Sequence, residues 1–174
     1  MQHDTKQQTS PGASFASALA AFLALPAMVA GLMPWLIARG DPWAGAGPEA
    51  VRWLGLLLAG VGLAVLLRCV RDFFVAGRGT LAPWDPPRQL VAVGLYRWVR
   101  NPMYVGVLTL VLGFAAAGRS PWLAAYAAVL AIAFHLRVRF FEEPWLARTF
   151  PEAWPAYAAA VPRWWPARRL KEPE

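Results

Sequence analysis

The feature that most constrains this chain is an uncharged run of 25 residues, from position 14 to position 38. A helix of about 20 apolar residues crosses the hydrocarbon of a bilayer, so a run of this length predicts a membrane span. Pro26 and Pro34 lie inside it, and membrane helices tolerate the kinks that prolines produce. A secretory signal has a basic start and an apolar stretch of about 7–15 residues, whereas residues 1–13 are a polar tail with one Lys and one Asp. We therefore expect a retained span, with a cleaved signal as the alternative.

Further apolar segments continue this pattern downstream. Together with the first run they predict four transmembrane helices, at about residues 14–38, 51–74, 102–117 and 121–141. Residues 151–174 are rich in Trp, Pro and Arg, which predicts a cytoplasmic cap with Trp154, Trp164 and Trp165 at headgroup depth. The expected fold is all-α: a polytopic membrane protein in which residues 14–174 form one domain.

The last two predicted spans are separated by only three residues. Gly118 suits the end of a helix, Ser120 suits an N-cap, and Pro121 suits the first position of the next helix. The pair is therefore predicted to be an antiparallel helical hairpin. Its short turn would place the start of one helix beside the end of the other.

The composition excludes several classes of protein. Hydrophobic residues make up 58% of the chain and charged residues 16%, against about 45–50% and about 25% in soluble domains. The aromatic content, 13%, argues against disorder. A single cysteine, Cys69, excludes an intrachain disulfide and a thiolate metal cluster. His3 and His135 are too few for a typical zinc site, so no metal is expected.

The net charge of +7 is explained by membrane topology. With four spans, 14 of the 17 Lys and Arg residues fall on the side that holds both termini and the connection from 68 to 101. Because Lys and Arg concentrate in cytoplasmic segments, both termini are expected to be cytoplasmic, with the protein integral to the cytoplasmic membrane. The same charges attract anionic lipid, and no nucleic-acid partner is needed to explain them.

Polar side chains are costly in a membrane protein, so their clustering indicates function. They gather in residues 94–106 and 135–150, which the predicted hairpin brings together at the cytoplasmic face. Glu142 and Glu143 are adjacent carboxylates at a helix C-terminus, where they repel each other and oppose the helix dipole. A cation should compensate them: Arg139 on the same helix, Arg97 or Arg100 across the hairpin, or a bound cationic ligand. An ion network that only anchors the helix end is the alternative.

The same region carries blocks of residues in a fixed order. They are GLYRWVRNPMYVG at 94–106, EEPWL at 142–146, Phe150, Tyr157 and VPRW at 161–164. This order resembles the integral-membrane methyltransferases of the isoprenylcysteine carboxyl methyltransferase and phospholipid methyltransferase group, with a pattern close to G-x-Y-R-x-x-R-H-P-x-Y-x-G, then E-E-x-x-L and V-P-R. The resemblance implies S-adenosylmethionine (SAM) bound at the cytoplasmic end of the hairpin and a lipophilic acceptor entering from the bilayer. The chain has no G-x-G-x-x-G turn, so a Rossmann-like SAM site is not expected.

The resemblance also implies roles for single residues. It places at the cofactor Tyr96, Arg97, Arg100, Asn101, Tyr104, Gly106, His135, Glu142 and Glu143. The two acids would hold the amino group or ribose hydroxyls of SAM, an arginine would hold its carboxylate, and Gly106 would permit close approach. Tyr104 and Arg139 would steer the acceptor and the methyl group, which makes them the expected catalytic residues. Each residue also has a structural interpretation, such as interfacial anchoring for Tyr104 and helix packing for Gly106.

The chain departs from this pattern at three positions. Asn101 stands where the pattern has His and carries no titratable group. Pro151 replaces Gly and Trp154 replaces Tyr in the segment expected to cover the cofactor. The acceptor therefore stays open among a carboxylate, an amine and a thiol. Two rival functions also remain: a non-enzymatic transporter subunit or scaffold, and a membrane reductase or isomerase on a similar helical fold.

Overall fold

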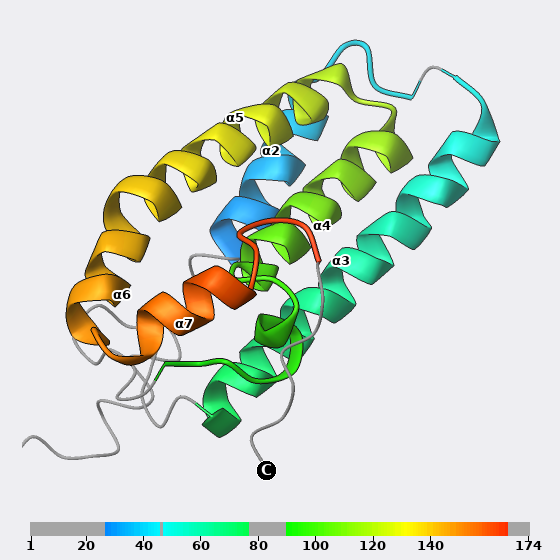
Figure 1. Cartoon of the computed structure of the whole chain (residues 1–174). Coiled ribbons are helices and arrows are strands. Elements are labelled where there is room, and N and C mark those ends of the chain that lie inside the picture. Colours follow the sequence, from blue (N-terminus) through cyan, green and yellow to red (C-terminus); the bar gives the residue numbers. More distant parts are fainter. Residues whose placement is uncertain (1–26, 46, 77–89, 167–174) are drawn as a thin grey trace, which may run out of the picture.

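The computed structural model describes residues 27–45, 47–76 and 90–166, and every regular element among them is helical (Figure 1). In chain order these are η1 (Met28–Leu32), α2 (Met33–Gly40), α3 (Glu49–Ala76), η2 (Gly94–Arg97), α4 (Pro102–Gly118), α5 (Pro121–Arg137), η3 (Val138–Glu142), α6 (Glu143–Thr149) and α7 (Ala153–Ala160). The elements η1 and η3 are π-helical turns, and η2 is a 3-10 turn. The all-α expectation is confirmed for this part of the chain. The expected polar tail and the first half of the first predicted span lie outside it.

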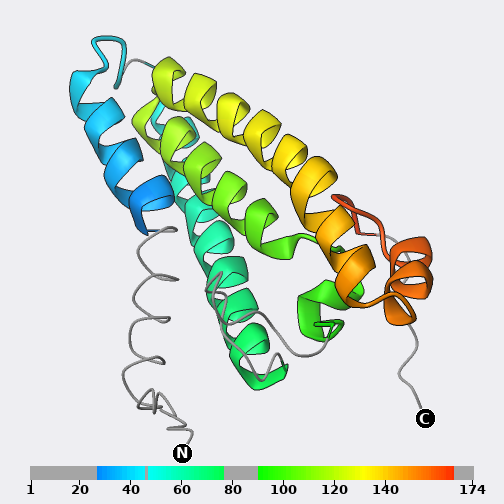
Figure 2. The ribbon, with the colours of Figure 1, turned by 90° about the vertical axis from the view of Figure 1, so that its left-hand side faces the viewer.

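Helices α2, α3, α4 and α5 run side by side (Figures 1 and 2). α4 lies between α3 and α5, and α2 packs against both α4 and α5. Their shared core is built from aliphatic side chains, among them Leu66, Val107, Leu110, Val111 and Ala127. The Tyr126 hydroxyl donates to the Val29 carbonyl at 2.9 Å and so joins α5 to η1.

Helices α3 and α4 approach so closely that only glycine fits at several positions. A Cβ atom on Gly62 would lie 2.4 Å from the amide nitrogen of Leu110, and one on Gly113 would lie 2.3 Å from that of Ala59. Gly106 faces the same contact. Close backbone approach at small residues is typical of helices that associate in membranes, where packing replaces the hydrophobic driving force. The contact fixes the start of α4, which carries the candidate site, against α3.

The turn between α4 and α5 confirms the predicted hairpin. Ser120 caps α5 by accepting the Leu123 amide at 3.1 Å, and Pro121 occupies the first turn. Gly118 is the last residue of α4, as expected, but the left-handed conformation belongs to Arg119, with a φ of 51°.

Asp41 joins the loop after α2 to the start of α5. Its carboxylate is buried and accepts hydrogen bonds from the Ser120 hydroxyl and from the amides of Trp43 and Trp122, at 2.9 and 3.3 Å for the two amides. Burial raises the pKa of Asp41, but these hydrogen bonds outweigh it, and the pKa lies below its ordinary value of 3.8. Because the pKa is lowered in the folded state, the ionised carboxylate stabilises the fold at pH values above 3.8. This stabilisation is lost as the pH falls through the folded-state pKa.

We expect Asp41→Asn to lower the melting temperature near neutral pH. The difference from the wild type should begin to shrink below about pH 4, where the carboxylate of the unfolded chain becomes protonated, and should shrink further as the pH falls through the lower folded-state pKa. Thermal unfolding of both proteins in detergent, between about pH 3 and pH 8, measures this difference. A difference that does not change with pH would contradict the assignment.

The helix lengths correct the expectation of four full spans. Two helical stretches are long and apolar enough to cross a membrane, Glu49–Asp72 and Pro121–Thr149. The other two apolar helices, Met28–Gly40 and Pro102–Gly118, are shorter. At roughly 1.5 Å per residue, α4 rises about 26 Å, which is less than the hydrocarbon thickness of about 30 Å. The last helix runs past its expected end at residue 141, because η3 continues it into α6.

Candidate functional site

The start of α4 lies beside the end of α5, so the polar stretches 94–106 and 135–150 meet at one junction. Gly94 opens η2 with a φ of 55°, and a Cβ atom there would lie 1.9 Å from the carboxylate of Asp72. Only glycine therefore permits this turn against α3. The turn leads into Asn101 and α4, whose first residues face η3 and α6 through the side-chain contacts described next.

Glu143 is the more enclosed of the two acids at the junction, with 11% of its side chain exposed. The guanidinium of Arg163 donates to both carboxylate oxygens, from Nε at 2.7 Å and from Nη2 at 2.6 Å. Nη1 of Arg100 lies 2.9 Å from Oε1 of the same carboxylate. Bidentate pairing of this kind is the strongest form of a charge-assisted hydrogen bond. Glu143 thus joins α6 to two chain segments that are distant in sequence.

The charges of this group are unequal, because one carboxylate faces two guanidinium groups. The hydrogen bond to Glu143 raises the pKa of Arg163. Burial lowers the pKa of Arg100, although Glu143 opposes this shift. Both arginines stay protonated, since the ordinary pKa of arginine is above about 12. Within the described part of the chain, the buried Nε of Arg100 has no hydrogen-bond partner.

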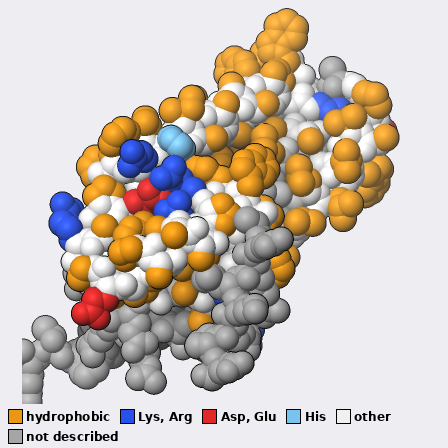
Figure 3. Space-filling view, in the orientation of Figure 1, with side chains coloured by type: hydrophobic (Ala, Val, Ile, Leu, Met, Phe, Trp, Pro, Cys, Tyr) orange, Lys and Arg blue, Asp and Glu red, His pale blue; other side chains and the backbone are white. Residues whose placement is uncertain are grey.

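Glu142 belongs to a second, more open group. Its Oε1 atom accepts a short hydrogen bond from the Tyr104 hydroxyl and a second one from Nε of Arg137 at 2.7 Å. The same Nε lies 3.1 Å from the Tyr104 oxygen, and the Tyr104 ring stacks on Phe134 at 4.4 Å. Figure 3 shows basic side chains, with a histidine next to them, gathered around an acidic group on one face of the molecule.

The chain after α7 closes one side of the junction. The amide of Arg100 donates to the Pro162 carbonyl at 2.9 Å, and Nδ2 of Asn101 donates to the Arg163 carbonyl at 3.2 Å. These bonds hold residues 162–163 along the start of α4. The C-terminal segment therefore contributes to the site itself.

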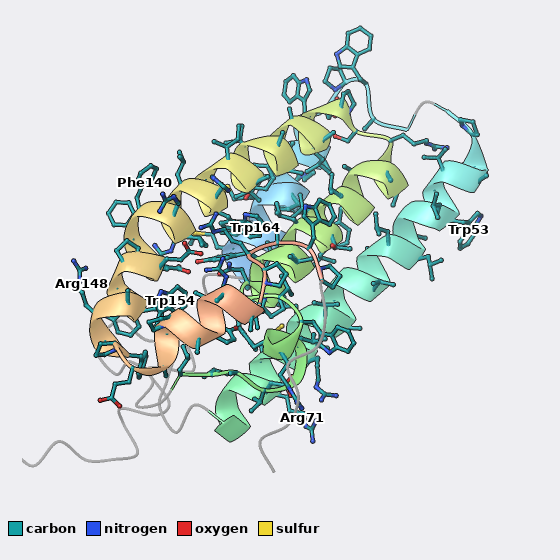
Figure 4. The ribbon with its side chains drawn as sticks, viewed as in Figure 1. Trp53, Arg71, Phe140, Arg148, Trp154 and Trp164 are labelled. Atoms are coloured by element: carbon teal, nitrogen blue, oxygen red, sulfur yellow. The ribbon has the colours of Figure 1, made fainter. Side chains whose placement is uncertain are left out.

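Two aromatic residues of α7 pack on the junction, and one of them, Trp154, is labelled in Figure 4. Trp154 is 9% exposed and lies under the guanidinium of Arg100, 5.6 Å from its ring centre. The Tyr157 hydroxyl donates to the Tyr96 carbonyl at 2.8 Å. The ring of Trp154 is therefore used for internal packing, and its expected position at headgroup depth stays a prediction. Trp165, in contrast, is 82% exposed.

Trp164 holds the imidazole of His135 at the edge of the junction. Its Nε1 atom donates to Nδ1 of the imidazole at 3.2 Å. The two rings are tilted to each other, with their centres 6.1 Å apart. The C-terminal segment therefore contacts the end of α5 as well as the start of α4.

The structure brings most of the predicted site residues together at the junction, but not all of them. Arg100, Asn101, Tyr104, His135 and the two acids make the contacts just described. Tyr96 is buried beside them, and Arg97 is half-buried in η2. Gly106 faces α3. Arg139 is exposed, and no ion pair to it is found among the described residues.

A π turn explains which arginine meets which acid. An α-helix brings residues four apart together, which led to the expected pair of Arg139 with Glu143. In η3 the spacing is wider, since π-helical hydrogen bonds join residues five apart. Arg137 therefore reaches Glu142, while Glu143 pairs with Arg100 and Arg163. The predicted alternative of Arg100 across the hairpin is confirmed, and the local pairing with Arg139 is not found among the described residues.

Sequence reasoning missed three contributors to the junction. Arg137 was interpreted only as a topology charge, and Arg163 and Trp164 were part of the VPRW block but received no role in the site. For Arg163 a signal was present, because it belongs to the Val-Pro-Arg block. For Arg137 the α-helical spacing concealed the contact.

Comparison with known proteins agrees with this geometry. A family model described as phospholipid methyltransferase matches residues 50–153, more than half of the chain. The chain belongs to the phospholipid methyltransferase family. Membership confirms the resemblance drawn from the sequence blocks and indicates methyltransferase activity on a lipid-related substrate. Searches of curated proteins and of solved structures found no match.

The family match includes most of the junction. It spans α3, η2, α4, α5, η3 and α6, so both acids and Tyr104 lie within it. Arg163 and Trp164 lie beyond its end at residue 153. In this phospholipid methyltransferase family member, the C-terminal contacts therefore complete a group that the matched residues begin.

Proposed function

We propose that the protein transfers a methyl group from SAM to a lipophilic or membrane-accessible acceptor. The observation that supports this most is the junction itself: two acids, three arginines and Tyr104 gathered where α4 begins and α5 ends. Charged groups beside apolar helices are costly, and they tend to be retained for binding or catalysis. Family membership adds the reaction type.

The junction has the chemical groups that SAM requires. SAM carries a carboxylate, an amino group and ribose hydroxyls, so a site for it needs charges of both signs. The buried, unpartnered Nε of Arg100 suits the carboxylate, with Arg97 as the second candidate. Glu142 and Glu143 suit the amino group and the hydroxyls. The residues that would frame the cofactor are Tyr96, Asn101, Tyr104, Gly106 and His135. When bound, SAM supplies a methyl group that is already activated.

The chain then has to align the acceptor and exclude water. Holding a nucleophile near 3 Å in the right direction supplies most of the acceleration in such a transfer. Tyr104 is suited to this role because Glu142 and Arg137 hold its hydroxyl and Phe134 holds its ring. Arg139, exposed on η3, is suited to steer an anionic group of the acceptor. A carboxylate acceptor needs no base, whereas an amine would lose its proton to one of the acids.

The outer faces of the helices support a location in a membrane. Leu57 on α3, Ile132 on α5 and Phe141 on η3 expose 66%, 62% and 71% of their surface. Figure 3 shows hydrophobic side chains over much of the visible surface of the bundle. We propose an integral membrane protein with four apolar helices, in which the bilayer adapts to the short α4. The distribution of Lys and Arg supports a proposed orientation with the junction and both termini on the cytoplasmic face.

One observation favours a rival interpretation. Both oxygens of Glu143 are already paired with arginine, so the ion pairs by themselves account for a fastened C-terminal segment. A scaffold of this kind would have no affinity for SAM and no transfer activity.

A transfer assay separates the two interpretations. Purified protein in detergent with methyl-labelled SAM should label an acceptor from a panel of lipophilic carboxylates, amines and thiols. Tyr104→Phe should lower the rate about 100-fold, which is the cost of a misplacement of about 1 Å. The matched control is Tyr126→Phe, which loses a hydroxyl bonded to Val29, and it should keep the wild-type rate. Folded protein that labels none of the three acceptor classes would contradict the proposal.

A further inference from the structure

We infer that Asn101 is a positioning residue that acts through Arg163: its side chain holds the Arg163 backbone so that the guanidinium meets Glu143. This inference rests on the proposed function, since the positioned group is part of the proposed SAM site. The family pattern has a titratable histidine at this position. In this chain, the inference gives Asn101 the role of a hydrogen-bond donor instead.

The first support is a hydrogen bond that Asn101 does not make. Asn101 is the N-cap of α4, and asparagine is favoured there because its side-chain oxygen accepts an amide of the first turn. In this structure the side chain makes no capping hydrogen bond. Its Nδ2 atom instead donates to the Arg163 carbonyl at 3.2 Å. Helix capping therefore does not account for the use of the Asn101 side chain.

The second support is the geometry of the residue that Asn101 holds. The neighbouring amide, from Arg100, donates to the Pro162 carbonyl at 2.9 Å, so two consecutive residues hold the same short segment. Val161, just before this segment, is fully buried. The two hydrogen bonds and the buried Val161 hold the backbone of this segment. Arg163 then directs its guanidinium to both oxygens of Glu143. Loss of the Asn101 bond would release one of these constraints.

The third support is the chemistry required at this position. The Arg163 carbonyl is an acceptor, so residue 101 has to supply an N–H. Asparagine does so at any pH, and histidine can do so through a ring nitrogen. An aspartate near neutral pH offers only acceptors, which would face the carbonyl and attract the guanidinium away from Glu143. The position therefore serves as a donor and takes no proton from the acceptor.

The decisive pair of variants is Asn101→Asp and Asn101→His, studied in the full-length protein. Aspartate is as good an N-cap as asparagine, so a role in helix capping alone predicts unchanged SAM affinity. We expect Asn101→Asp to weaken SAM binding about tenfold, the scale of one lost hydrogen bond. Asn101→His should stay within about threefold of the wild type. Calorimetric titration with SAM measures both values, and wild-type affinity in Asn101→Asp would overturn the inference.

A double-mutant cycle tests whether Asn101 acts through Arg163. In an Arg163→Ala background, Asn101→Asp should cause no further loss of SAM affinity. A full tenfold loss in that background would overturn the inference. Ser120→Ala is the control, since it removes an N-cap bond at the other end of the bundle. It should lower the melting temperature and leave SAM affinity unchanged.

Hydrogen exchange tests the inference independently of the proposed function, because it does not require SAM binding. The amide of Arg100, which donates to the Pro162 carbonyl, should exchange faster in Asn101→Asp than in Ser120→Ala, whether or not SAM binds. Equal exchange in the two variants would overturn the inference. Wild-type protein that shows no SAM affinity would overturn the proposed function instead.

Discussion

Replacing Glu143 with glutamine is expected to reduce SAM affinity at least about 100-fold and to destabilise the fold. The carboxylate is 11% exposed and compensates two guanidinium groups, from Arg100 and Arg163. Glutamine keeps the size but removes the charge, so two cations would face a neutral amide. Removing one partner of a buried ion pair costs about 3–5 kcal/mol. The loss of affinity follows because the same carboxylate and Arg100 are proposed to hold SAM.

Glu152→Gln is the matched control for this change. Glu152 is an exposed acid before α7, so the substitution removes the same charge from the same C-terminal region. Its melting temperature and SAM affinity should equal those of the wild type. Thermal unfolding and calorimetric titration of both variants measure the effects. If Glu143→Gln behaved like Glu152→Gln, the ion pairs of Glu143 would contribute neither to stability nor to SAM binding.

The second large effect concerns the contact between α3 and α4. Gly113→Ala should lower the free energy of unfolding by about 3 kcal/mol, because the added Cβ meets backbone that cannot rotate away. It would lie 2.3 Å from the amide nitrogen and 2.6 Å from the Cα atom of Ala59. The two helices would have to separate, and the start of α4 would move with them.

Gly60→Ala is the opposite control for the helix contact. A Cβ atom on Gly60 meets nothing within 4 Å, and the residue lies in the middle of α3. Alanine is favoured over glycine in a helix by about 1 kcal/mol, so this variant should be more stable than the wild type. Thermal unfolding in detergent gives the sign for each variant. A destabilised Gly60→Ala, or an unchanged Gly113→Ala, would contradict the described packing of α3 on α4.

Much of the site was predictable because local signals and a short turn determine it. Gly118, Ser120 and Pro121 predicted the hairpin, and the hairpin placed residues 94–106 beside residues 135–150. The adjacent carboxylates predicted that cations would gather around them. The structure supplies these cations as Arg100, Arg137 and Arg163.

Other features depend on geometry that residue spacing does not show. The π turn η3 replaces the expected contact of Arg139 with the contact of Arg137, which residue spacing alone does not show. The signal in the sequence is Pro144 just after the turn, because a proline inside a helix lacks an N–H and clashes with the carbonyl four residues before it. The position of Arg163 depends on hydrogen bonds to the start of α4, 62 residues away in the case of Asn101. The burial of Trp154 against Arg100 and the contact of Gly106 with α3 are likewise long-range packing, which the sequence around each residue does not show.

Calorimetric titration of the purified protein with SAM and, separately, with NADPH tests the central claim most directly. The claim is that the acids and arginines at the start of α4 and the end of α5 form a site for a methyl donor. It predicts saturable binding of one SAM per chain, no binding of NADPH, and loss of the SAM signal in Glu143→Gln. Folded protein that binds NADPH in place of SAM, or that binds neither, would contradict it.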